Sequence, residues 1–256
     1  MDLKGRAAIV TGSSSVTGIG AETAQALAAK GCNVVINYVS NRPGAEETAA
    51  ACAARGADTL IVQGNVSQDA DCRRMAAAAV ERWGRLDILV NNAATTRTIP
   101  QADLEALSGE EFHRIYDVNV VGTFQMTRAA AKHLKASGNG AVVNISSIGA
   151  WRGNGSSMAY SASKGALNTL TISLARVLAP EVRVNAICPG GLLGNWTSKI
   201  MSEEAYQRRV QQAETEFPLH RAVWPTDVAR LAVWLCEDAN TMTGEAFRMD
   251  SGQHLD

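Results

Sequence analysis

Short runs rich in valine and isoleucine alternate with alanine-rich stretches along almost the whole chain, and this alternation constrains the fold more than any other feature. The runs are apolar at consecutive positions, which is typical of parallel strands covered on both faces, and each intervening stretch can form a crossover helix. We therefore expect an α/β fold with a doubly wound parallel sheet between two layers of helices. The predicted strands are residues 7–11, 33–38, 59–63, 86–91, 141–145 and 182–187, with a short last strand near 245–249.

The chain of 256 residues contains no internal repeat, low-complexity tract or Pro/Ser-rich linker that would divide it. A single domain of the Rossmann type, residues 1–256, is therefore predicted, with ligands bound beyond the carboxyl ends of the strands. The alternation breaks between residues 191 and 221, where a helical pattern occupies only the middle. We interpret this segment as a small lobe that covers the substrate.

Charge, cysteine and histidine patterns narrow the classes of function. The 24 basic and 25 acidic residues are balanced and form no basic block that would follow a phosphate backbone. No apolar stretch approaches the roughly 20 residues of a membrane span, and the N-terminus lacks the apolar core of a signal peptide. The five cysteines form no C-x-x-C pair and the four histidines are scattered. We expect a cytoplasmic protein with no metal, nucleic-acid partner or membrane association.

A glycine-rich turn follows the first predicted strand and leads into a helical segment at residues 21–30. Its glycines are Gly12, Gly18 and Gly20. Such glycines permit a tight turn and let backbone N–H groups approach a pyrophosphate, which the helix N-terminus also stabilises. Alone, the turn could be an ordinary strand-to-helix connection, but its place after the first strand of an alternating pattern favours a dinucleotide.

The end of the second strand bears on the choice of dinucleotide. A site that prefers NAD places a carboxylate there, about 20 residues after the turn, whereas residues 37–42 read Asn-Tyr-Val-Ser-Asn-Arg. NADP(H) is therefore the predicted cofactor, with NAD(H) as the alternative, because nothing acidic would repel a 2′-phosphate. Arg42 also has the competing interpretation of a solvated loop charge. The side chains that could bind the phosphate are those of Ser14, Ser15, Ser40 and Arg42.

Tyr160 and Lys164 are four residues apart in a segment of helical composition, so their side chains lie on one helix face. A tyrosine normally titrates near 10, and it acts as an acid or base at neutral pH when a nearby positive charge stabilises its phenolate. Lys164 can supply that charge. Because Y-x-x-x-K arises by chance in roughly one such chain in ten, the pair alone could equally be a surface helix pair.

Further motifs accompany this pair in a fixed order. With the glycine-rich turn, they make the chain resemble the short-chain dehydrogenase/reductase family over nearly its whole length. Each motif is modest, but together they are specific. They are Asn65-Val66 after the third predicted strand, Asn91-Asn92-Ala93 after the fourth, Asn119 within Val118 to Gly122, Ile145-Ser146-Ser147 after the fifth, and Pro189-Gly190 after the sixth.

The resemblance implies the site residues. The family's usual separation of serine and tyrosine selects Ser147 over Ser146 as the catalytic serine and leaves Ser146 as a supporting residue. Asn119 is implied to interrupt its helix and to hold a water that leads to Lys164; a buried asparagine bonded to backbone is compatible with that role. The implied catalytic residues are Asn119, Ser147, Tyr160 and Lys164. The implied cofactor contacts are Gly12, Ser14, Ser15, Gly18, Ile19, Gly20, Ser40, Asn65, Val66, Asn92, Ala93, Tyr160, Lys164, Pro189, Gly190 and Leu192.

The chain departs from the family pattern at three places. The glycine-rich turn is two residues longer than usual, which leaves its serine–phosphate contacts open. Gly194 stands five residues after Pro189, where the family often has a threonine that helps to hold the nicotinamide carboxamide, and Thr197 is a candidate substitute. Ala94 replaces a glycine that is common at its position.

The function implied by the resemblance is that of a carbonyl reductase or alcohol dehydrogenase, closest in pattern to a 3-oxoacyl-thioester reductase. Tyr160 would be the general acid/base that interconverts a carbonyl compound and a secondary alcohol, while Ser147 hydrogen-bonds to the substrate oxygen. Aromatic residues near the expected lobe favour a partly apolar ligand, although packing explains them equally well. They are Trp151, Trp196 and Phe217.

Two other functions stay open. Nucleotide-sugar epimerases and dehydratases use tyrosine and lysine at the same spacing, but we do not expect their C-terminal substrate domain here. A catalytically silent NADP-binding regulator would have a broken catalytic set, whereas all four positions are filled.

The resemblance also implies a homo-oligomer, a tetramer or dimer, in which the helix carrying Tyr160 packs across a two-fold axis. Small residues would permit that packing or packing within the chain: Ala159, Ala162, Ser163 and Ala166.

Overall fold

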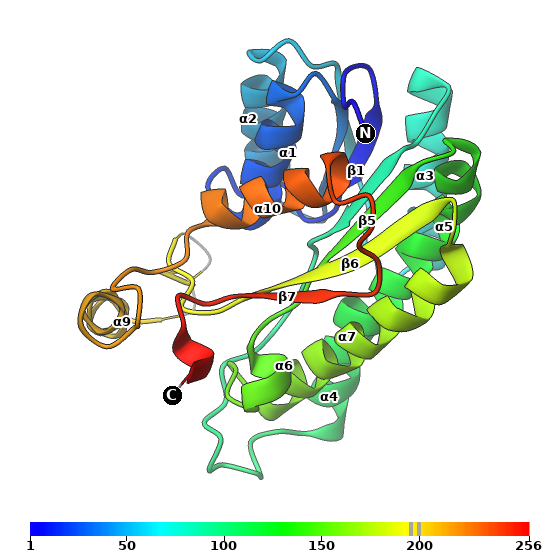
Figure 1. The fold of residues 1–256 in the computed structure, drawn as a ribbon. Coiled ribbons are helices and arrows are strands. Elements are labelled where there is room, and N and C mark those ends of the chain that lie inside the picture. Colours follow the sequence, from blue (N-terminus) through cyan, green and yellow to red (C-terminus); the bar gives the residue numbers. More distant parts are fainter. Residues whose placement is uncertain (195–196, 199–200, 256) are drawn as a thin grey trace.

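Seven parallel strands form one sheet in the computed structural model, which describes residues 1–194, 197–198 and 201–255 (Figure 1). The strands follow the order β3-β2-β1-β4-β5-β6-β7, and every neighbouring pair is parallel. The predicted doubly wound sheet is confirmed, with strand ends within two residues of those expected. The strands are β1 (Ala7–Val10), β2 (Asn33–Tyr38), β3 (Thr59–Gln63), β4 (Ile88–Asn91), β5 (Gly140–Ile145), β6 (Val182–Pro189) and β7 (Ala246–Met249).

Helices connect the strands and cover both faces of the sheet. They are α1 (Ile19–Ala29), α2 (Arg42–Ala53), α3 (Asp69–Trp83), α4 (Gly109–Tyr116), the π-helical turn η1 (Asp117–Gly122), α5 (Thr123–Ala136), α6 (Gly149–Arg152), α7 (Met158–Leu178), α9 (Glu203–Thr215), α10 (Pro225–Glu237) and the 3₁₀ turn η2 (Gln253–Leu255). Helices α1, α2 and α10 lie on one face, and α3, α5 and α7 on the other (Figure 1). In the part of the chain that the structure describes, no helix is both long and apolar enough to cross a membrane.

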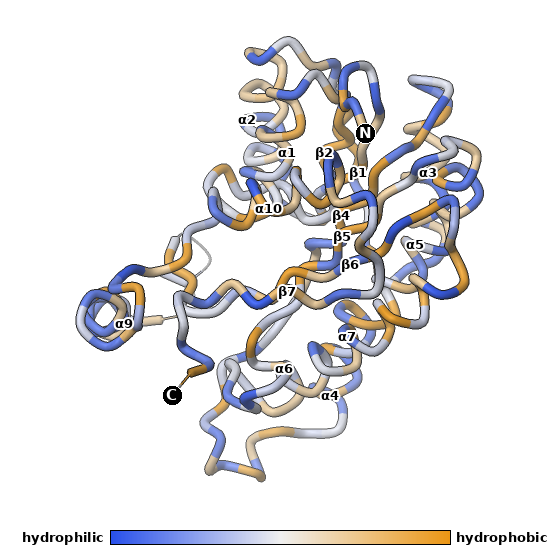
Figure 2. The backbone as a smooth tube through the Cα atoms, in the orientation of Figure 1, coloured by the Kyte–Doolittle hydropathy of each residue, from blue (hydrophilic) through white to orange (hydrophobic). Residues whose placement is uncertain are grey.

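Successive residues of the central strands pack on opposite faces. In β1, Val10 belongs to the apolar cluster under α1, α2 and α10, whereas Ile9 belongs to the cluster under α3, α5 and α7. Ile9 is in register with Val35 of β2 and Leu89 of β4, and all three side chains are fully buried. Burying one such side chain contributes roughly 1.5–3 kcal/mol. Both faces of these strands are therefore apolar, and hydrophobic residues are frequent along the strands at the centre of the molecule (Figure 2).

Helix α9 belongs to the expected lobe and stands apart from the sheet (Figure 1). Ser202 begins this helix by accepting a hydrogen bond from the N–H of Ala205. The lobe has a small apolar cluster of its own, made of Leu193, Ala213, Phe217 and Ala222. Residues 195, 196, 199, 200 and 256 lie outside the described residues.

The order of the strands reverses between β1 and β4, which end side by side. In open α/β sheets, ligands bind in the crevice outside the strand ends at such a point. Thr11 joins the two strand ends, because its Oγ1 accepts hydrogen bonds from the N–H groups of Asn92 and Ala93, each at 3.0 Å. The fold therefore presents the glycine-rich turn and the end of β4 at one edge.

Candidate active site

A cavity of about 950 Å³ opens at the carboxyl edge of the sheet. Its walls come from the glycine-rich turn, the ends of β2, β4, β5 and β6, the start of α7, and α9. All of the implied cofactor contacts line this cavity, and so does Ser147, whereas Asn119 and the candidate phosphate ligand Arg42 do not. The structure thus brings together residues that are far apart in the sequence.

Two glycines of the turn stand where a larger residue would clash with backbone or with Asn92. Gly12 has a φ of +62°, and a Cβ there would lie 2.9 Å from the Cα of Ala93. A Cβ at Gly20 would lie 2.5 Å from Nδ2 of Asn92, which donates hydrogen bonds to two carbonyl oxygens of the turn at 2.9 Å. The turn is therefore held against the end of β4, with its backbone open to the cavity.

The three serines of the lengthened turn have different surroundings. Ser13 is buried, and its Oγ donates to a carbonyl of β1 at 2.8 Å and accepts from the N–H of Asn37 at 3.0 Å. Ser14 and Ser15 line the cavity, and the carbonyl of Ser15 accepts the N–H of Gly18 at 2.6 Å. The hydroxyl of Ser13 is thus committed to the fold, while Ser14 and Ser15 border the space for a ligand.

The end of β2 borders the cavity without an acidic side chain. Ser40 lines the cavity beside Asn41, which caps α2 and donates from Nδ2 to the carbonyl of Ser14 at 2.6 Å. Arg42, one of the candidate phosphate ligands, does not line the cavity. Its Nε pairs with Oε1 of Glu46 at 2.8 Å on the exposed surface of α2. Arg42 is therefore a solvated surface charge, which was the competing interpretation. Glu46 lies four residues later on the same helix and is its partner.

Tyr160 lies in the first turn of α7. The helix begins at Met158, and the hydroxyl of Ser157 accepts a hydrogen bond from the N–H of Tyr160 at 3.2 Å. Burial raises the pKa of the Tyr160 phenol to about 12, while hydrogen bonding to Ser147 acts in the opposite direction. Ser147 also accepts the N–H of Gly149 at 3.1 Å. Two hydroxyl groups thus meet at the cavity wall, and the phenol is protonated at neutral pH.

Lys164 follows Tyr160 by one helical turn and is only 2% exposed. Its Nζ donates to the carbonyl of Ile145 at 2.7 Å and lies 5.5 Å from the centre of the Tyr160 ring. Burial lowers the pKa of this ammonium group to about 8. Ser146 donates from Oγ to the backbone carbonyl of Lys164 at 3.2 Å, so it contacts the helix and not the phenol. Among the described residues, no carboxylate forms an ion pair with Lys164.

Asn119 lies behind the cavity wall in η1, which interrupts the helix between α4 and α5 where an interruption was expected. Its Oδ1 accepts the N–H of Thr95 at 2.8 Å, and its Nδ2 donates to the carbonyl of Thr95 at 3.1 Å and to Oγ of Ser163 at 3.0 Å. Ser163 in turn donates to the carbonyl of Tyr160 at 2.7 Å. The side-chain amide therefore joins the loop after β4 to the backbone of Tyr160.

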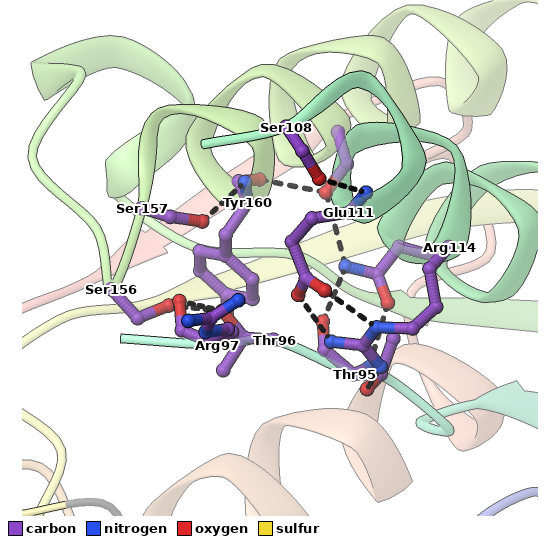
Figure 3. A network of polar contacts seen from close by, with 11 residues as sticks. Thr95, Thr96, Arg97, Ser108, Glu111, Arg114, Ser156, Ser157 and Tyr160 are labelled. Atoms are coloured by element: carbon purple, nitrogen blue, oxygen red, sulfur yellow. Dashed lines mark hydrogen bonds and ion pairs between the residues drawn. The ribbon is translucent and has the colours of Figure 1, made fainter. Parts of the chain in front are cut away.

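The loop after β4 extends the cavity wall beyond Asn92 and Ala93, through residues that the sequence analysis did not assign. Thr95 lines the cavity, and its Oγ1 accepts a hydrogen bond from Nη1 of Arg114 at 2.7 Å, while Glu111 pairs with Arg114 (Figure 3). Thr96 hydrogen-bonds to Ser156 just before α7 (Figure 3). These contacts join one loop to two helices that are distant in the sequence, so no local sequence pattern predicts them. The position directly after the fourth strand is the signal that could have drawn attention to the loop.

The segment after β6 approaches the cavity closely. A Cβ at Gly190 would lie 2.2 Å from Cδ1 of Ile148, so only glycine fits at this position without a shift. Thr197, the candidate substitute for the family's threonine, lines the cavity, and its hydroxyl donates to the carbonyl of Leu192 at 3.0 Å. Gly194 has a φ of +128°, a conformation that threonine rarely adopts. The local backbone thus accounts for the departure from the family pattern.

Of the two interpretations of the aromatic residues, pocket lining and packing, the structure has packing for the two residues that it describes. Phe217 is buried in the apolar cluster of the lobe, where its ring packs with Leu193 and Ala213. Trp151 lies outside the cavity lining, and the guanidinium of Arg248 lies 4.7 Å from its ring centre. The third, Trp196, lies outside the described residues. The lobe lies apart from the main core and needs a large side chain to fill its own, which explains the position of Phe217.

Comparisons with known proteins agree with this architecture. A family model described as Enoyl-(Acyl carrier protein) reductase matches residues 12–254. The chain is 44% identical over 248 residues to "Granaticin polyketide synthase putative ketoacyl reductase 2" of Streptomyces violaceoruber, covering 97% of this chain and 96% of that protein. It is 32% identical over 252 residues, 98% of each chain, to the 3-oxoacyl-[acyl-carrier-protein] reductase FabG of Staphylococcus aureus.

Solved structures give the same relationship. A crystal structure described as "a putative short-chain dehydrogenase/reductase" from Burkholderia xenovorans matches with a TM-score of 0.90 and 40% identity, covering 98% of both chains. The short-chain dehydrogenase/reductase SDR:Glucose/ribitol dehydrogenase from Brucella melitensis matches with a TM-score of 0.85 and 28% identity over the same share of both chains. Sequence, fold and named relatives lead to one conclusion: the chain belongs to the short-chain dehydrogenase/reductase family of oxidoreductases.

Proposed function

We propose that the protein interconverts a carbonyl compound and a secondary alcohol with NADP(H), and that Tyr160 is its general acid/base. The observation that carries the proposal is the meeting of the Tyr160 phenol, the Ser147 hydroxyl and the Lys164 ammonium in one cavity with the glycine-rich turn. In this proposal the whole chain, residues 1–256, acts as one domain. Residues 191–221 form the lobe over the substrate, which agrees with the presence of α9 residues in the cavity lining.

The cavity fits a dinucleotide. It opens where the strand order reverses, and Gly12 and Gly20 leave room that a Cβ would fill. In the proposal, the turn holds the pyrophosphate, and Ser14, Ser15 and Ser40 border a 2′-phosphate. Among the described lining residues there is no Asp or Glu to repel that phosphate, which supports NADP(H) over NAD(H). The cofactor would supply the hydride when bound.

The residues of the chain would carry out the proton chemistry. During reduction, Tyr160 gives its phenolic proton to the substrate oxygen, and Ser147 donates a hydrogen bond to the same oxygen. The charge on Lys164 stabilises the phenolate that results. Asn119 keeps Tyr160 in place through Ser163, whose hydroxyl bonds to the Tyr160 carbonyl. In alcohol oxidation the same groups act in reverse, and the phenolate accepts the proton.

Names of relatives support a substrate class within this reaction. A ketoacyl reductase and a 3-oxoacyl-[acyl-carrier-protein] reductase are among them, at 44% and 32% identity. A relative named Glucose 1-dehydrogenase 2, from Bacillus subtilis, is 35% identical over 257 residues. We therefore propose a 3-oxoacyl-thioester-like ketone as the first substrate class to test, with glucose as the comparison.

A substrate panel tests the function. Purified protein is mixed with NADPH and a set of ketones and 3-oxoacyl thioesters, and absorbance at the nicotinamide band reports cofactor consumption. We expect net consumption with at least one ketone. A nucleotide-sugar epimerase would turn over its substrate without net consumption, and a silent regulator would bind NADPH without reaction, so either result would overturn the proposal.

We also propose that the protein is a homo-oligomer, a tetramer or dimer, built around α7. Ala159 and Ser163 are buried within the chain, whereas Ala162 is exposed and leaves α7 open to a second copy. Exposed apolar side chains lie on the same helix layer, Phe124 on α5 and Ile172 on α7. Sedimentation velocity should show a species larger than a monomer, and Ile172→Glu should reduce its mass. A monomeric wild-type protein at micromolar concentration would contradict this proposal.

A further inference from the structure

The cavity carries an arginine that neither the fold nor the proposed proton chemistry uses. Arg209 lies in the middle of α9 and lines the cavity together with Gln212, one helical turn later. Its Nε is buried from solvent and has no hydrogen-bond partner. Among the described residues, the Arg209 side chain forms neither an ion pair within 4 Å nor a hydrogen bond. Arg209 is partly buried, and its guanidinium donors have no acceptor among the described protein groups.

Two carboxylates of α9 bond to glutamine side chains of the same helix. Glu216, at the end of the helix, accepts a hydrogen bond from Nε2 of Gln212 at 2.8 Å. Glu203, at its start, accepts one from Gln207 at 2.8 Å. No Asp or Glu is among the described residues of the cavity lining, where the charged side chains are Arg152, Lys164 and Arg209. The cavity is therefore cationic on the side of the lobe as well as beside Tyr160.

Burying a charged group without a partner costs free energy, and the pKa of Arg209 is lowered by this burial. An anion that enters the cavity would recover that cost by accepting hydrogen bonds from the guanidinium. Carboxylates and phosphates suit this role, because their oxygens match the planar fork of arginine in a bidentate pair. Arg152 is a weaker candidate, because its Nη1 already donates to the carbonyl of Gln253 at 2.5 Å.

We propose that Arg209 binds an anionic group of the substrate, a carboxylate or phosphate, and makes the enzyme selective for carbonyl compounds that carry such a group. This inference rests on the proposed function, because it assigns the anion to the substrate of that reaction. The position of Arg209 on α9, opposite the sheet, places the anion at the lobe and the reacting carbonyl at Tyr160. Arg209 would thus fix which end of the substrate faces the phenol.

Matched pairs of substrates test the proposal. The pairs are 4-oxopentanoate and 5-oxohexanoate, each with its methyl ester, and dihydroxyacetone phosphate with dihydroxyacetone. Rates of NADPH oxidation give kcat/KM for each compound with wild-type protein, Arg209→Gln and Arg208→Gln. The last variant removes the same charge from the neighbouring, exposed position of α9 and is the matched control. Comparing the acid pairs with the phosphate pair shows whether Arg209 binds a carboxylate or a phosphate group of the substrate.

We expect at least one anion to be preferred over its neutral partner by about ten-fold or more, as a charge-assisted hydrogen-bonded pair implies. Arg209→Gln should bring that preference close to one through a higher KM for the anion, with kcat/KM for the neutral partner and KM for NADPH within about two-fold. Arg208→Gln should keep the preference. The proposal is overturned if wild type shows no preference in any pair, if Arg209→Gln weakens both members equally, or if the variant changes KM for NADPH instead.

Calorimetry separates this proposal from the proposed reaction. If no compound is reduced, the carbonyl reductase function fails for these substrates, and the heat of binding of 4-oxopentanoate and of dihydroxyacetone phosphate to NADP⁺-loaded protein becomes the deciding measurement. Binding that wild type and Arg208→Gln share and that Arg209→Gln loses by about ten-fold supports the anion site. Equal binding by all three proteins, or no binding at all, overturns it.

Discussion

Nζ of Lys164 lies 5.5 Å from the centre of the Tyr160 ring, but its hydrogen bond goes to the backbone carbonyl of Ile145. The ammonium group is thus fixed by the end of β5 and acts on the phenol through space. Burial pushes both groups towards their neutral forms, raising the pKa of Tyr160 to about 12 and lowering that of Lys164 to about 8. A charge held this close in a poorly solvated site favours the phenolate more than it would in water.

Replacing Tyr160 by phenylalanine should abolish turnover and leave cofactor binding largely intact. The variant removes the phenolic oxygen that exchanges the proton, while the ring and the α7 backbone stay in place. We expect kcat to fall by at least about 100-fold, within the usual range for losing a general acid/base. Steady-state rates and fluorescence titration with NADPH measure the two effects. Retained turnover would refute the assignment of Tyr160.

Lys164→Met should change how stability depends on pH. Because the pKa of Lys164 is about 8 in the folded protein and about 10.5 when unfolded, the unfolded chain binds more protons between these values. This residue therefore makes the free energy of unfolding rise with pH from about 8 to about 10, by at most about 1.4 kcal/mol per pH unit for one proton. The rise is absent below pH 8, where both states are protonated.

Denaturant titrations at pH 7.5, 8.5 and 9.5 measure this contribution as the difference between wild type and Lys164→Met. Other groups, such as the five cysteines, titrate in this range in the unfolded chain, but they are common to both proteins and largely cancel in the difference. Lys132→Met, which changes an exposed lysine of α5, is the matched control. Parallel pH profiles for wild type and Lys164→Met would contradict the depressed pKa.

The sequence predicts the strands, the helices and the glycine-rich turn well, because hydrophobic periodicity and the need for glycine in a tight turn are local properties. The strand containing Ile9 and the turn at Gly12 can be predicted from the residues next to them in the sequence. Contacts between distant segments cannot be predicted in this way. The hydrogen bond from Arg114 to Thr95 and the unpaired guanidinium of Arg209 depend on how a loop and a lobe fold over the sheet. The sequence leaves Phe217 open between pocket lining and packing for the same reason, since its packing partners lie within the lobe.

Gly20→Ala should destabilise the protein and weaken the binding of NADPH. Its methyl group would lie 2.5 Å from Nδ2 of Asn92 and 2.6 Å from the carbonyl oxygen of Gly12, so the turn or the end of β4 must move. Such overpacking costs about 1–3 kcal/mol. Gly109→Ala is the control, because a Cβ at the start of α4 meets nothing within 4 Å. Thermal unfolding and cofactor titration of both variants measure the effects. Equal unfolding temperatures and equal Kd values for NADPH would show that the turn accommodates a methyl group at Gly20.

Ser40→Asp should reverse the preference between the two cofactors. Ser40 lines the cavity at the end of β2, and its side chain is exposed, so the substitution adds a charge without disturbing the core. The carboxylate would repel a 2′-phosphate and can hydrogen-bond to the free ribose hydroxyls of NADH. We expect the Kd for NADPH to rise by about ten-fold, since repulsion between like charges about 4 Å apart costs about 1 kcal/mol or more even in water, while the Kd for NADH stays equal or falls. Ser40→Asn, of similar size but uncharged, should change both values little.

Fluorescence titration with both cofactors measures these dissociation constants. If Ser40→Asp and Ser40→Asn bind NADPH equally well, the 2′-phosphate does not lie beside Ser40. Tighter binding of NADH than of NADPH by wild type would contradict the preference for NADP(H) itself.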